Sequence, residues 1–443
     1  MKVAVLGAGE SGVGAAILAT KNKYEVWLSD SGQIADKYKQ VLSHFDISWE
    51  ENGHSEKEIM VSDLVVKSPG IPETADLIIK LKEADVKVVS EIEFAYQHTN
   101  STIVAITGSN GKTTTTNLTY SMFEKAGVDV GMAGNVGFSL AKQVAENDHD
   151  YYILELSSFQ LDGIDTFKPK VAVLLNITPD HLNRYENKLE NYAESKFRIT
   201  MNQDQDDYFI YNYDDKIIRK MIKDKNIKAQ MVPFSIKTKL EEGAWIEKDL
   251  LNININHNSL SMSIYELALK GKHNAYNSMA SAVASRVLQI SNKDIRDSLV
   301  SFKGIEHRLE HVANVDGIDF INDSKATNVN SVWYALDSVE GDIVWIAGGV
   351  DKGNKYADLS DLVKDKVKAI ICLGKNNKKI ISAFKDQVVD IQETTSVDQA
   401  VQLAKLVGRP GDTVLLSPAC ASFDLFENYE DRGHQFKAAV RAL

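Results

Sequence analysis

The sequence is poor in cysteine and has no long apolar run. Its two cysteines, Cys372 and Cys420, belong to no C-x-x-C pair, so we expect reduced thiols and neither a disulfide framework nor a structural zinc site. No stretch of about 18 apolar residues occurs, and the chain passes from Met1-Lys2 directly into an apolar strand. This pattern predicts no membrane span and no signal peptide. These absences favour a cytoplasmic protein.

The chain also lacks an excess of positive charge. Its 50 Lys and Arg residues are outnumbered by 62 Asp and Glu residues, which gives a formal net charge of −12. That balance argues against a general affinity for nucleic acid or for anionic membranes. It does not exclude an anionic small-molecule substrate, because a local site can be basic on an acidic surface.

Strands and glycine turns divide the chain into three segments, in line with the two to four domains that 443 residues predict. Residues 1–96 alternate short apolar strands, such as "VAVLG" and "EVWLSD", with helical stretches. Residues 97–300 restart with a buried strand, a glycine turn and an amphipathic helix. Residues 301–443 again hold strands that end in polar or glycine-rich turns. This alternation predicts an α/β fold with parallel sheets.

The first glycine turn follows the first strand. Gly7, Gly9 and Gly12 fit G-x-G-x-x-G, and Asp30 closes the next strand, which is a dinucleotide-binding fingerprint. One interpretation is an NAD(P)-dependent oxidoreductase. The other is the same helix N-terminus facing the diphosphate of a different ligand. The second interpretation is favoured, because no constellation of hydride-transfer residues is evident downstream.

The second glycine turn, "ITGSNGKTTTT", is the most informative stretch. Gly108, Gly111, Lys112 and Thr113 lie between a strand and a helix, and Ile106 stands where the usual P-loop has glycine. Backbone N–H groups in such a turn form an anion cradle, the lysine can reach the outer phosphates, and the threonine hydroxyl can bind Mg²⁺. The strand–loop–helix context favours ATP binding over a simple helix cap.

Four further motifs extend the pattern to residue 426. They are "ELSSFQL", "NITPDHLNRY", "NDSKATN" and "SPACASFDLF". With "TGSNGKTTT" they resemble the muramyl ligases, the ATP-dependent amide-forming enzymes of bacterial peptidoglycan precursor synthesis. The four further motifs resemble those of the branch that adds D-glutamate to UDP-N-acetylmuramoyl-L-alanine, and the last of them is the most discriminating. The resemblance implies a Rossmann-like N-terminal domain (1–96), a central P-loop-type ATPase domain (97–300) and a Rossmann-like C-terminal domain (301–443).

The resemblance also implies a chemistry and a set of ATP and metal residues. The substrate carboxylate would attack the γ-phosphate of ATP to give an acyl phosphate, which the amine of D-glutamate then attacks. The implied ATP contacts are Gly108, Asn110, Gly111, Lys112, Thr113, Thr114, Asn274, Asn277, Arg308, Asp323 and Lys325. The implied Mg²⁺ ligands, for two ions, are Thr113, Glu155, His181 and a carbamylated Lys196. The implied catalytic residues are Lys112, Asn135, His181 and Lys196.

The remaining implied residues bind the two other substrates. Those for the UDP substrate are Glu10, Ser11, Asp30, Ser31, Gly70, Asn135 and His181. Those for D-glutamate are Thr327, Lys352, Ser417 and Phe423. Several have a plainer interpretation: Glu155 as a solvated strand end, Lys196 as an exposed helix lysine, Asn274 as a helix N-cap. The third domain would have to close onto the second to complete the site.

Alternative functions remain at this point. A sister ligase that adds L-alanine, or a polyglutamate ligase, would share the mechanism. The former is not expected to carry "SPACASFDLF", and the latter would lack the first domain. An NAD(P)-dependent oxidoreductase with a regulatory ATP site is the competitor from another class. For partners we expect small molecules only, no nucleic acid and no membrane, and a monomeric protein.

Overall fold

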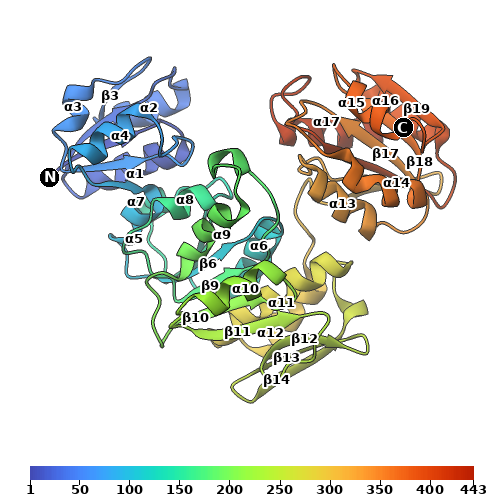
Figure 1. Cartoon of the computed structure of the whole chain (residues 1–443), viewed down its shortest axis with the longest axis horizontal. Helices are drawn as coiled ribbons and strands as arrows, with labels where there is room; N and C mark the ends of the chain where they lie inside the picture. The colour runs from blue at the N-terminus through green and yellow to red at the C-terminus, as the bar shows by residue number, and fades with distance from the viewer. The chain divides into compact units, whose positions relative to one another are not determined.

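The structure is a computed structural model that describes residues 1–443 and holds three β-sheets (Figure 1). The chain forms two compact units. The first unit comprises Met1–Leu267 and Asn274–Phe302, and the second comprises Ala268–His273 and Lys303–Leu443. None of the helices is both long and apolar enough to cross a membrane.

The first sheet of the first unit has five parallel strands in the order β3-β2-β1-β4-β5. The strands are β1 (Lys2–Leu6), β2 (Glu25–Ser29), β3 (Ser48–Glu50), β4 (Leu64–Lys67) and β5 (Val88–Ser90). The helices are α1 (Glu10–Lys21), α2 (Asp36–His44), α3 (Glu56–Met60), α4 (Asp76–Glu83) and α5 (Glu91–Tyr96). Because the chain leaves β1 for one side of the sheet and later returns to its other side, the carboxyl end of β1 is a topological switch point.

The second sheet of the first unit has nine strands in the order β14-β13-β12-β11-β10-β9-β6-β8-β7. The strands are β6 (Thr102–Thr107), β7 (Val130–Gly134), β8 (Tyr151–Glu155), β9 (Val171–Leu174), β10 (Tyr208–Asn212), β11 (Gln230–Ser235), β12 (Gly243–Glu247), β13 (Leu250–Ile255) and β14 (Asn258–Ser263). Only β12, β13 and β14 pair antiparallel. β6 is almost wholly buried, as expected for a parallel strand covered on both faces. Its carboxyl end is the second switch point.

The helical segments that follow β6 accompany the second sheet. They are α6 (Lys112–Lys125), α7 (Leu140–Glu146), α8 (Ser158–Asp162), η1 (Leu182–Arg184), α9 (Leu189–Phe197), η2 (Arg198–Thr200), α10 (Lys216–Asp224), η3 (Ile264–Glu266), α11 (Lys272–Val287) and α12 (Asn292–Ser301). α1 packs against α7. One apolar core therefore runs from Val5 and Ile17 through Leu140 to Leu154.

The second unit holds a six-stranded sheet in the order β15-β16-β20-β17-β18-β19. Its strands are β15 (Glu310–Val315), β16 (Ile318–Asn322), β17 (Ile343–Gly348), β18 (Val367–Leu373), β19 (Asp390–Thr394) and β20 (Thr413–Ala419). Its remaining elements are α13 (Val329–Ser338), η4 (Tyr356–Leu359), α14 (Ser360–Lys366), α15 (Lys378–Phe384), α16 (Val397–Val407) and α17 (Tyr429–Arg441). Only β15 runs antiparallel to its neighbour. The predicted α/β class with largely parallel sheets is confirmed.

Candidate active site

The first glycine loop is bound by an acidic side chain from the end of β2. Asp30, which follows β2, accepts hydrogen bonds from Ala8 N at 2.7 Å and Gly32 N at 2.8 Å. A Cβ atom added at Gly12 would lie 1.8 Å from Gly7 O, so only glycine lets α1 start this close to the turn. The result is a helix N-terminus at a switch point, which is a ready anion-binding geometry.

Three of the other residues predicted for the UDP substrate lie close in sequence to this loop, and a fourth lies in the turn after β4. Glu10 and Ser11 open α1, and Ser31 lies exposed beyond Asp30. Gly70, in the turn after β4, accepts a hydrogen bond from Arg184 Nη1 at 3.3 Å. The first sheet and the segment around His181 are thus joined within one unit.

The second glycine loop lies at the carboxyl end of β6 and leads into α6. Gly111, at φ 84°, is the N-cap of that helix. Asn176 clamps the loop from the end of β9: its Oδ1 accepts from Asn110 N at 2.8 Å and its Nδ2 donates to Asn110 O at 3.0 Å. Thr113 and Thr114 are buried in the first turn of α6. Sequence reasoning missed Asn176, although it opens the "NITPDHLNRY" motif.

Two lysines converge on one carbonyl of this loop. Lys112 Nζ and Lys196 Nζ each donate to Gly108 O at 2.8 Å. Lys196, on α9, is only 1% exposed and lies 4.6 Å from the centroid of the Tyr192 ring. Burial, together with the nearby charge of Lys112, holds the pKa of Lys196 well below its usual value. The interpretation of Lys196 as an exposed helix lysine is therefore wrong.

Glu155 ends β8 directly beside the loop strand, in register with Ile106. It is 2% exposed, and its Oε1 accepts from Asn135 Nδ2 at 2.6 Å. Its Oε2 is buried without a hydrogen-bond donor, which is the condition that a bound cation relieves. A solvated strand end is thus excluded for Glu155.

His181 lies in the loop that follows β9, in a left-handed conformation with φ 51°. Its ring packs edge-on against that of Phe159, with 5.3 Å between the ring centroids. Its Nε2 is 3.7 Å from Asp180 Oδ2. The side chain is 55% exposed. The loop therefore presents an imidazole and a carboxylate to solvent in the unit that also holds Glu155 and Lys196.

The two asparagines predicted to contact adenine lie on α11. Asn277 is 1% exposed, and its Oδ1 accepts from Thr115 Oγ1 at 3.3 Å. A Cβ atom added at Gly111 would meet that same oxygen at 2.3 Å. Asn277 thus packs directly behind the glycine loop. Asn274 is not a helix N-cap, because α11 begins two residues earlier, at Lys272.

In the second unit, Asp323 and Ser417 bind one another. Asp323 Oδ2 accepts from Ser417 Oγ at 2.8 Å and Oδ1 accepts from Leu309 N at 3.3 Å. Burial raises the pKa of Asp323 to about 7. Ser417 is fully buried, so its predicted contact with D-glutamate stays a prediction. Arg308, half-buried, precedes Leu309 in the turn before β15.

The other predicted residues of the second unit lie in loops at the carboxyl ends of its strands. Lys325 Nζ donates to Tyr429 Oη at 2.9 Å and lies 4.7 Å from the centroid of that ring. Thr327 is half-buried. Lys352 is exposed after β17, and Phe423 is 69% exposed after β20. These loops present cationic, hydroxyl and apolar groups along one edge of the sheet.

Arg432 was not expected from the sequence, because nothing in its context marks an arginine on a helix as buried. It is 1% exposed on α17. Its guanidinium donates to Ser324 Oγ at 2.9 Å and Ser324 O at 2.8 Å, and to Cys420 O at 3.2 Å. One side chain therefore fixes both the "NDSKATN" and the "SPACASF" loops.

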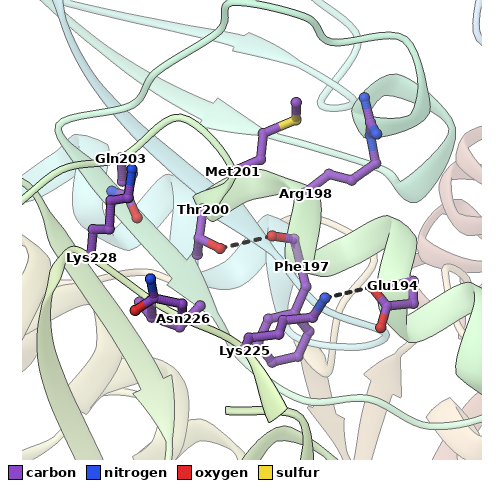
Figure 2. A pocket seen from close by; sticks show the side chains of 10 residues that line it. Glu194, Phe197, Arg198, Thr200, Met201, Gln203, Lys225, Asn226 and Lys228 are labelled. Carbon is purple, nitrogen blue, oxygen red and sulfur yellow. Dashed lines mark hydrogen bonds and ion pairs between the residues drawn. The ribbon is translucent and has the colours of Figure 1, made fainter. Parts of the chain in front are cut away.

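A separate cavity of about 290 Å³ opens beside α9 and the loop before β11 (Figure 2). Phe197 forms part of its wall, and Lys225 and Glu194, which also line it, are joined by an ion pair of 2.5 Å between Nζ and Oε2. None of the predicted site residues lines this cavity. It therefore has no part in the candidate active site.

Comparison with known proteins assigns the chain to a family. Residues 2–77 match the MurD N-terminal domain, residues 106–285 the Mur ligase middle domain, and residues 307–420 the glutamate ligase domain of Mur ligases. A protein of Christiangramia forsetii is 57% identical over 442 residues, covering 100% of this chain and 99% of the relative. One of Bacteroides thetaiotaomicron is 51% identical over 446 residues, covering 100% of both. Both are named UDP-N-acetylmuramoylalanine–D-glutamate ligase.

Solved structures with the same fold are more distant in sequence. UDP-N-acetylmuramate–alanine ligase of Thermotoga maritima superposes with a TM-score of 0.62 at 18% identity, covering 100% of this chain and 99% of that one. MurF ligase of the same organism, solved with ADP, gives a TM-score of 0.61 at 14% identity, covering 94% and 95%. These likenesses support the fold, and the relatives named above support the closer assignment. The chain therefore belongs to the Mur ligase family of ATP-dependent amide ligases, in the branch whose curated members are named UDP-N-acetylmuramoylalanine–D-glutamate ligase.

Proposed function

We propose that this protein joins D-glutamate to UDP-N-acetylmuramoyl-L-alanine at the expense of ATP, as a step of peptidoglycan precursor synthesis in the cytoplasm. The observation that carries the proposal is the identity of 57% along the whole chain with a relative of that name. The position of Lys112 supports it, because its Nζ lies at the glycine loop, where it bonds Gly108 O, and the attack of one anion on another requires positive charge close by.

The ATP phosphates are assigned to the second glycine loop. Backbone N–H groups of Gly108 and Gly111 and the N-terminus of α6 would provide the cradle. Asn110, whose own N–H bonds Asn176 Oδ1, is proposed to shape the loop around ATP. Lys112, whose Nζ now bonds the loop carbonyls Gly108 O and Ser109 O, would transfer those hydrogen bonds to phosphate oxygens. Thr114, in the first turn of α6, is assigned to the ATP phosphates as well. Asn274 and Asn277 are proposed for the adenine side, with Asn277 also supporting the loop.

The residues present fit a magnesium ion. Glu155 Oε2 is a buried carboxylate oxygen without a donor, and hydroxyl and carboxylate oxygens such as those of Thr113 and Glu155 are the ligands that Mg²⁺ prefers. Bound there, Mg²⁺ would neutralise phosphate charge. A second ion at His181 belongs to the proposal as well.

Lys196 is proposed to carry a carbamate. Addition of CO₂ to an amine needs the neutral form, forms an N–C bond and releases one proton. The burial of Lys196 and the lowered pKa of its amine supply that neutral form. The carbamate would present negative charge toward the proposed metal positions, where an ammonium would repel them.

In the proposed reaction, the L-alanyl carboxylate oxygen attacks the γ-phosphorus of ATP and ADP leaves. The amine of D-glutamate then attacks the acyl carbon, losing a proton, and phosphate leaves. Asn135 and His181 are proposed to orient the acyl end of the substrate. Glu10, Ser11, Asp30, Ser31 and Gly70 are proposed to hold its UDP end.

The second unit supplies the remaining proposed residues. Arg308 is assigned to the γ-phosphate, Asp323 to the ribose of ATP, and Lys325 to the phosphates. Thr327, Lys352, Ser417 and Phe423 are assigned to D-glutamate. We keep domain bounds of 1–96, 97–300 and 301–443 within the proposal, since α5 ends at Tyr96, β6 begins at Thr102 and the second unit resumes at Lys303.

A phosphate-release assay tests the proposal. The protein is incubated with ATP, Mg²⁺ and UDP-N-acetylmuramoyl-L-alanine, and D-glutamate, L-glutamate, L-alanine or a diamino acid is added. Phosphate release that depends on D-glutamate supports the proposal. Release with L-alanine or a diamino acid but not with D-glutamate would sink it and favour a sister ligase.

A further inference from the structure

The turn that carries Arg308 has an unfavourable backbone. Arg308 N donates to Ile305 O at 3.1 Å, which closes the turn. The residues on either side of Arg308 are left-handed: His307 has φ 65° and Leu309 has φ 44°. Non-glycine residues, and bulky ones such as leucine above all, avoid this region. The conformation therefore needs support from elsewhere in the unit.

That support comes from a lysine on the C-terminal helix. Lys437 Nζ, on α17, bonds Glu306 Oε1 at one end of the turn and Glu310 Oε1 at the other, the latter at 3.0 Å. Lys437 is only 8% exposed. Glu310 Oε2 in turn accepts from His307 N at 2.9 Å and from Asn322 Nδ2 at 3.0 Å. A single ammonium thus ties together both ends of the turn.

A glycine on the same helix makes room for this arrangement. A Cβ atom added at Gly433 would lie 2.1 Å from His307 Nδ1. Glycine in a helix interior weakens the helix, so its presence one turn before Lys437 points to the close approach of the turn. This observation is independent of the charged contacts.

The same cluster resembles a metal site, because ligand atoms of Glu306, His307 and His434 lie within 4.8 Å of one another. Two of the three are already engaged within the protein. Glu306 is paired with Lys437, whose positive charge opposes a cation, and His307 Nδ1 accepts from Asn322 Nδ2 at 2.9 Å. The contacts therefore favour an ionic clamp, in which Lys437 holds Glu306 and Glu310, over a metal site.

We propose that Lys437 is a positioning residue that holds the Glu306–Glu310 turn so that Arg308 meets the γ-phosphate of ATP. The inference rests on the role proposed above for Arg308. Lys437 itself touches no substrate. Loss of the clamp would weaken recognition of a triphosphate and leave recognition of a diphosphate unchanged, a difference that a merely structural lysine would not produce.

The test compares calorimetric affinities of the full chain for a non-hydrolysable ATP analogue and for ADP, both with Mg²⁺. Lys437→Met should lower the affinity for the analogue about 10-fold and the affinity for ADP less than twofold. Lys437→Arg should restore much of the lost affinity. In the Arg308→Ala background, Lys437→Met should cause no further loss of affinity for the analogue. Lys405→Met is the matched control, because Lys405 pairs with Asp316 at 3.0 Å on another helix of the same unit.

The outcomes separate the clamp from the proposed function. If Arg308→Ala lowers the affinity for the analogue more than that for ADP but Lys437→Met does not, the clamp alone is overturned. If Arg308→Ala leaves both ligands unaffected, the γ-phosphate role of Arg308 falls and the clamp with it. If Lys437→Met fails to fold, Glu310→Gln, which removes one anchor of the ammonium, must give the same discrimination. Zn²⁺ binding to the wild type that His434→Ala abolishes and His311→Ala does not would assign the cluster to a metal instead.

Discussion

At the scale of single residues, buried charge marks the candidate site. Lys196 and Glu155 are 1% and 2% exposed, although lysine and glutamate are rarely buried without a partner. Lys196 donates to a carbonyl and to no carboxylate in the structure, and Glu155 keeps one oxygen without a donor. Such arrangements cost stability and persist where a bound group uses them.

Lys196→Ala should lower turnover by about 100-fold or more, because it removes the proposed carbamate from the reacting centre. Added formate or propionate should restore part of the activity by supplying a carboxylate to the vacated space. Steady-state phosphate release measures both effects, and Lys188→Ala, at an exposed lysine just before the same helix, should behave as wild type. Full activity of Lys196→Ala in CO₂-free buffer would refute the carbamate role.

Glu155→Gln should separate stability from activity. Removing the charge of a buried carboxylate, one oxygen of which lacks a donor, relieves a desolvation cost, so the melting temperature without Mg²⁺ should stay the same or rise. Turnover should fall by about 100-fold or more, and the Mg²⁺ concentration for half-maximal rate should increase. Calorimetry and a Mg²⁺ titration of the rate measure the two effects. A variant that is less stable and equally active would contradict the assignment.

The motifs identify which residues are present but not what each side chain touches. Lys112 and Thr113 could be placed at a helix start and Glu155 at a strand end from the sequence, because strand, loop and helix follow one another directly. The contacts of Asn277 with Thr115 and of Ser417 with Asp323 could not, because each joins residues more than 90 positions apart. Arg432 was missed for the same reason.

At the scale of elements, the first glycine loop allows a matched pair of substitutions. Gly12→Ala places a methyl group 1.8 Å from Gly7 O, whereas a methyl group at Gly9 meets nothing within 4 Å. Gly12→Ala should therefore destabilise the protein by about 1–3 kcal/mol. Gly9→Ala should leave the melting temperature unchanged but raise KM for the UDP substrate, because the methyl group points to where the diphosphate approaches. The account of the loop fails if the two variants melt alike.

The junction of α5 and α7 should respond to pH. Glu91 is buried and accepts from Ser139 Oγ and Ala141 N, both at 2.7 Å. Burial raises its pKa from 4.5 to about 7. Because the folded state holds this proton more tightly than the unfolded state, the wild type loses stability as pH rises from about 4.5 through 7, by up to about 3 kcal/mol.

Glu91→Gln should remove this loss, so its unfolding free energy relative to wild type should increase between pH 5 and pH 8. Glu93, on the same helix, is the control. Although burial raises its pKa, hydrogen bonds from Thr166, Asp165 and Phe167 lower the pKa overall. Glu93→Gln should therefore lower the unfolding free energy by a nearly constant amount over this pH range. Denaturant unfolding at several pH values measures both, and a pH-independent effect of Glu91→Gln would contradict the prediction.

Much of the element pattern could be predicted, whereas its spatial order could not. The buried run of β6 and the glycine turn after it specify a strand and a helix start locally. The insertion of β20 between β16 and β17 depends on pairing across nearly 100 residues, which periodicity does not encode. The close approach of α17 to the turn that carries Arg308 likewise depends on Gly433 and Lys437. Neither residue belongs to a motif.

At the scale of the whole molecule, two glycine loops at two switch points are proposed to serve different anions. Both belong to the first unit, at the carboxyl ends of β1 and β6. The fingerprint of the first loop predicts contact with a diphosphate but does not specify the ligand, and the family relationship makes UDP the better assignment than NAD. The residues assigned to D-glutamate all lie in the second unit.

Transfer of oxygen from the substrate carboxylate to phosphate reports directly on the proposed reaction. The protein is supplied with ATP, Mg²⁺, D-glutamate and UDP-N-acetylmuramoyl-L-alanine labelled with ¹⁸O in its carboxylate, and product and phosphate are analysed by mass spectrometry. The account predicts a product enlarged by one D-glutamyl residue in amide linkage, and released phosphate that carries one ¹⁸O atom from the substrate. Absence of the D-glutamyl product, or its formation with unlabelled phosphate, would contradict it.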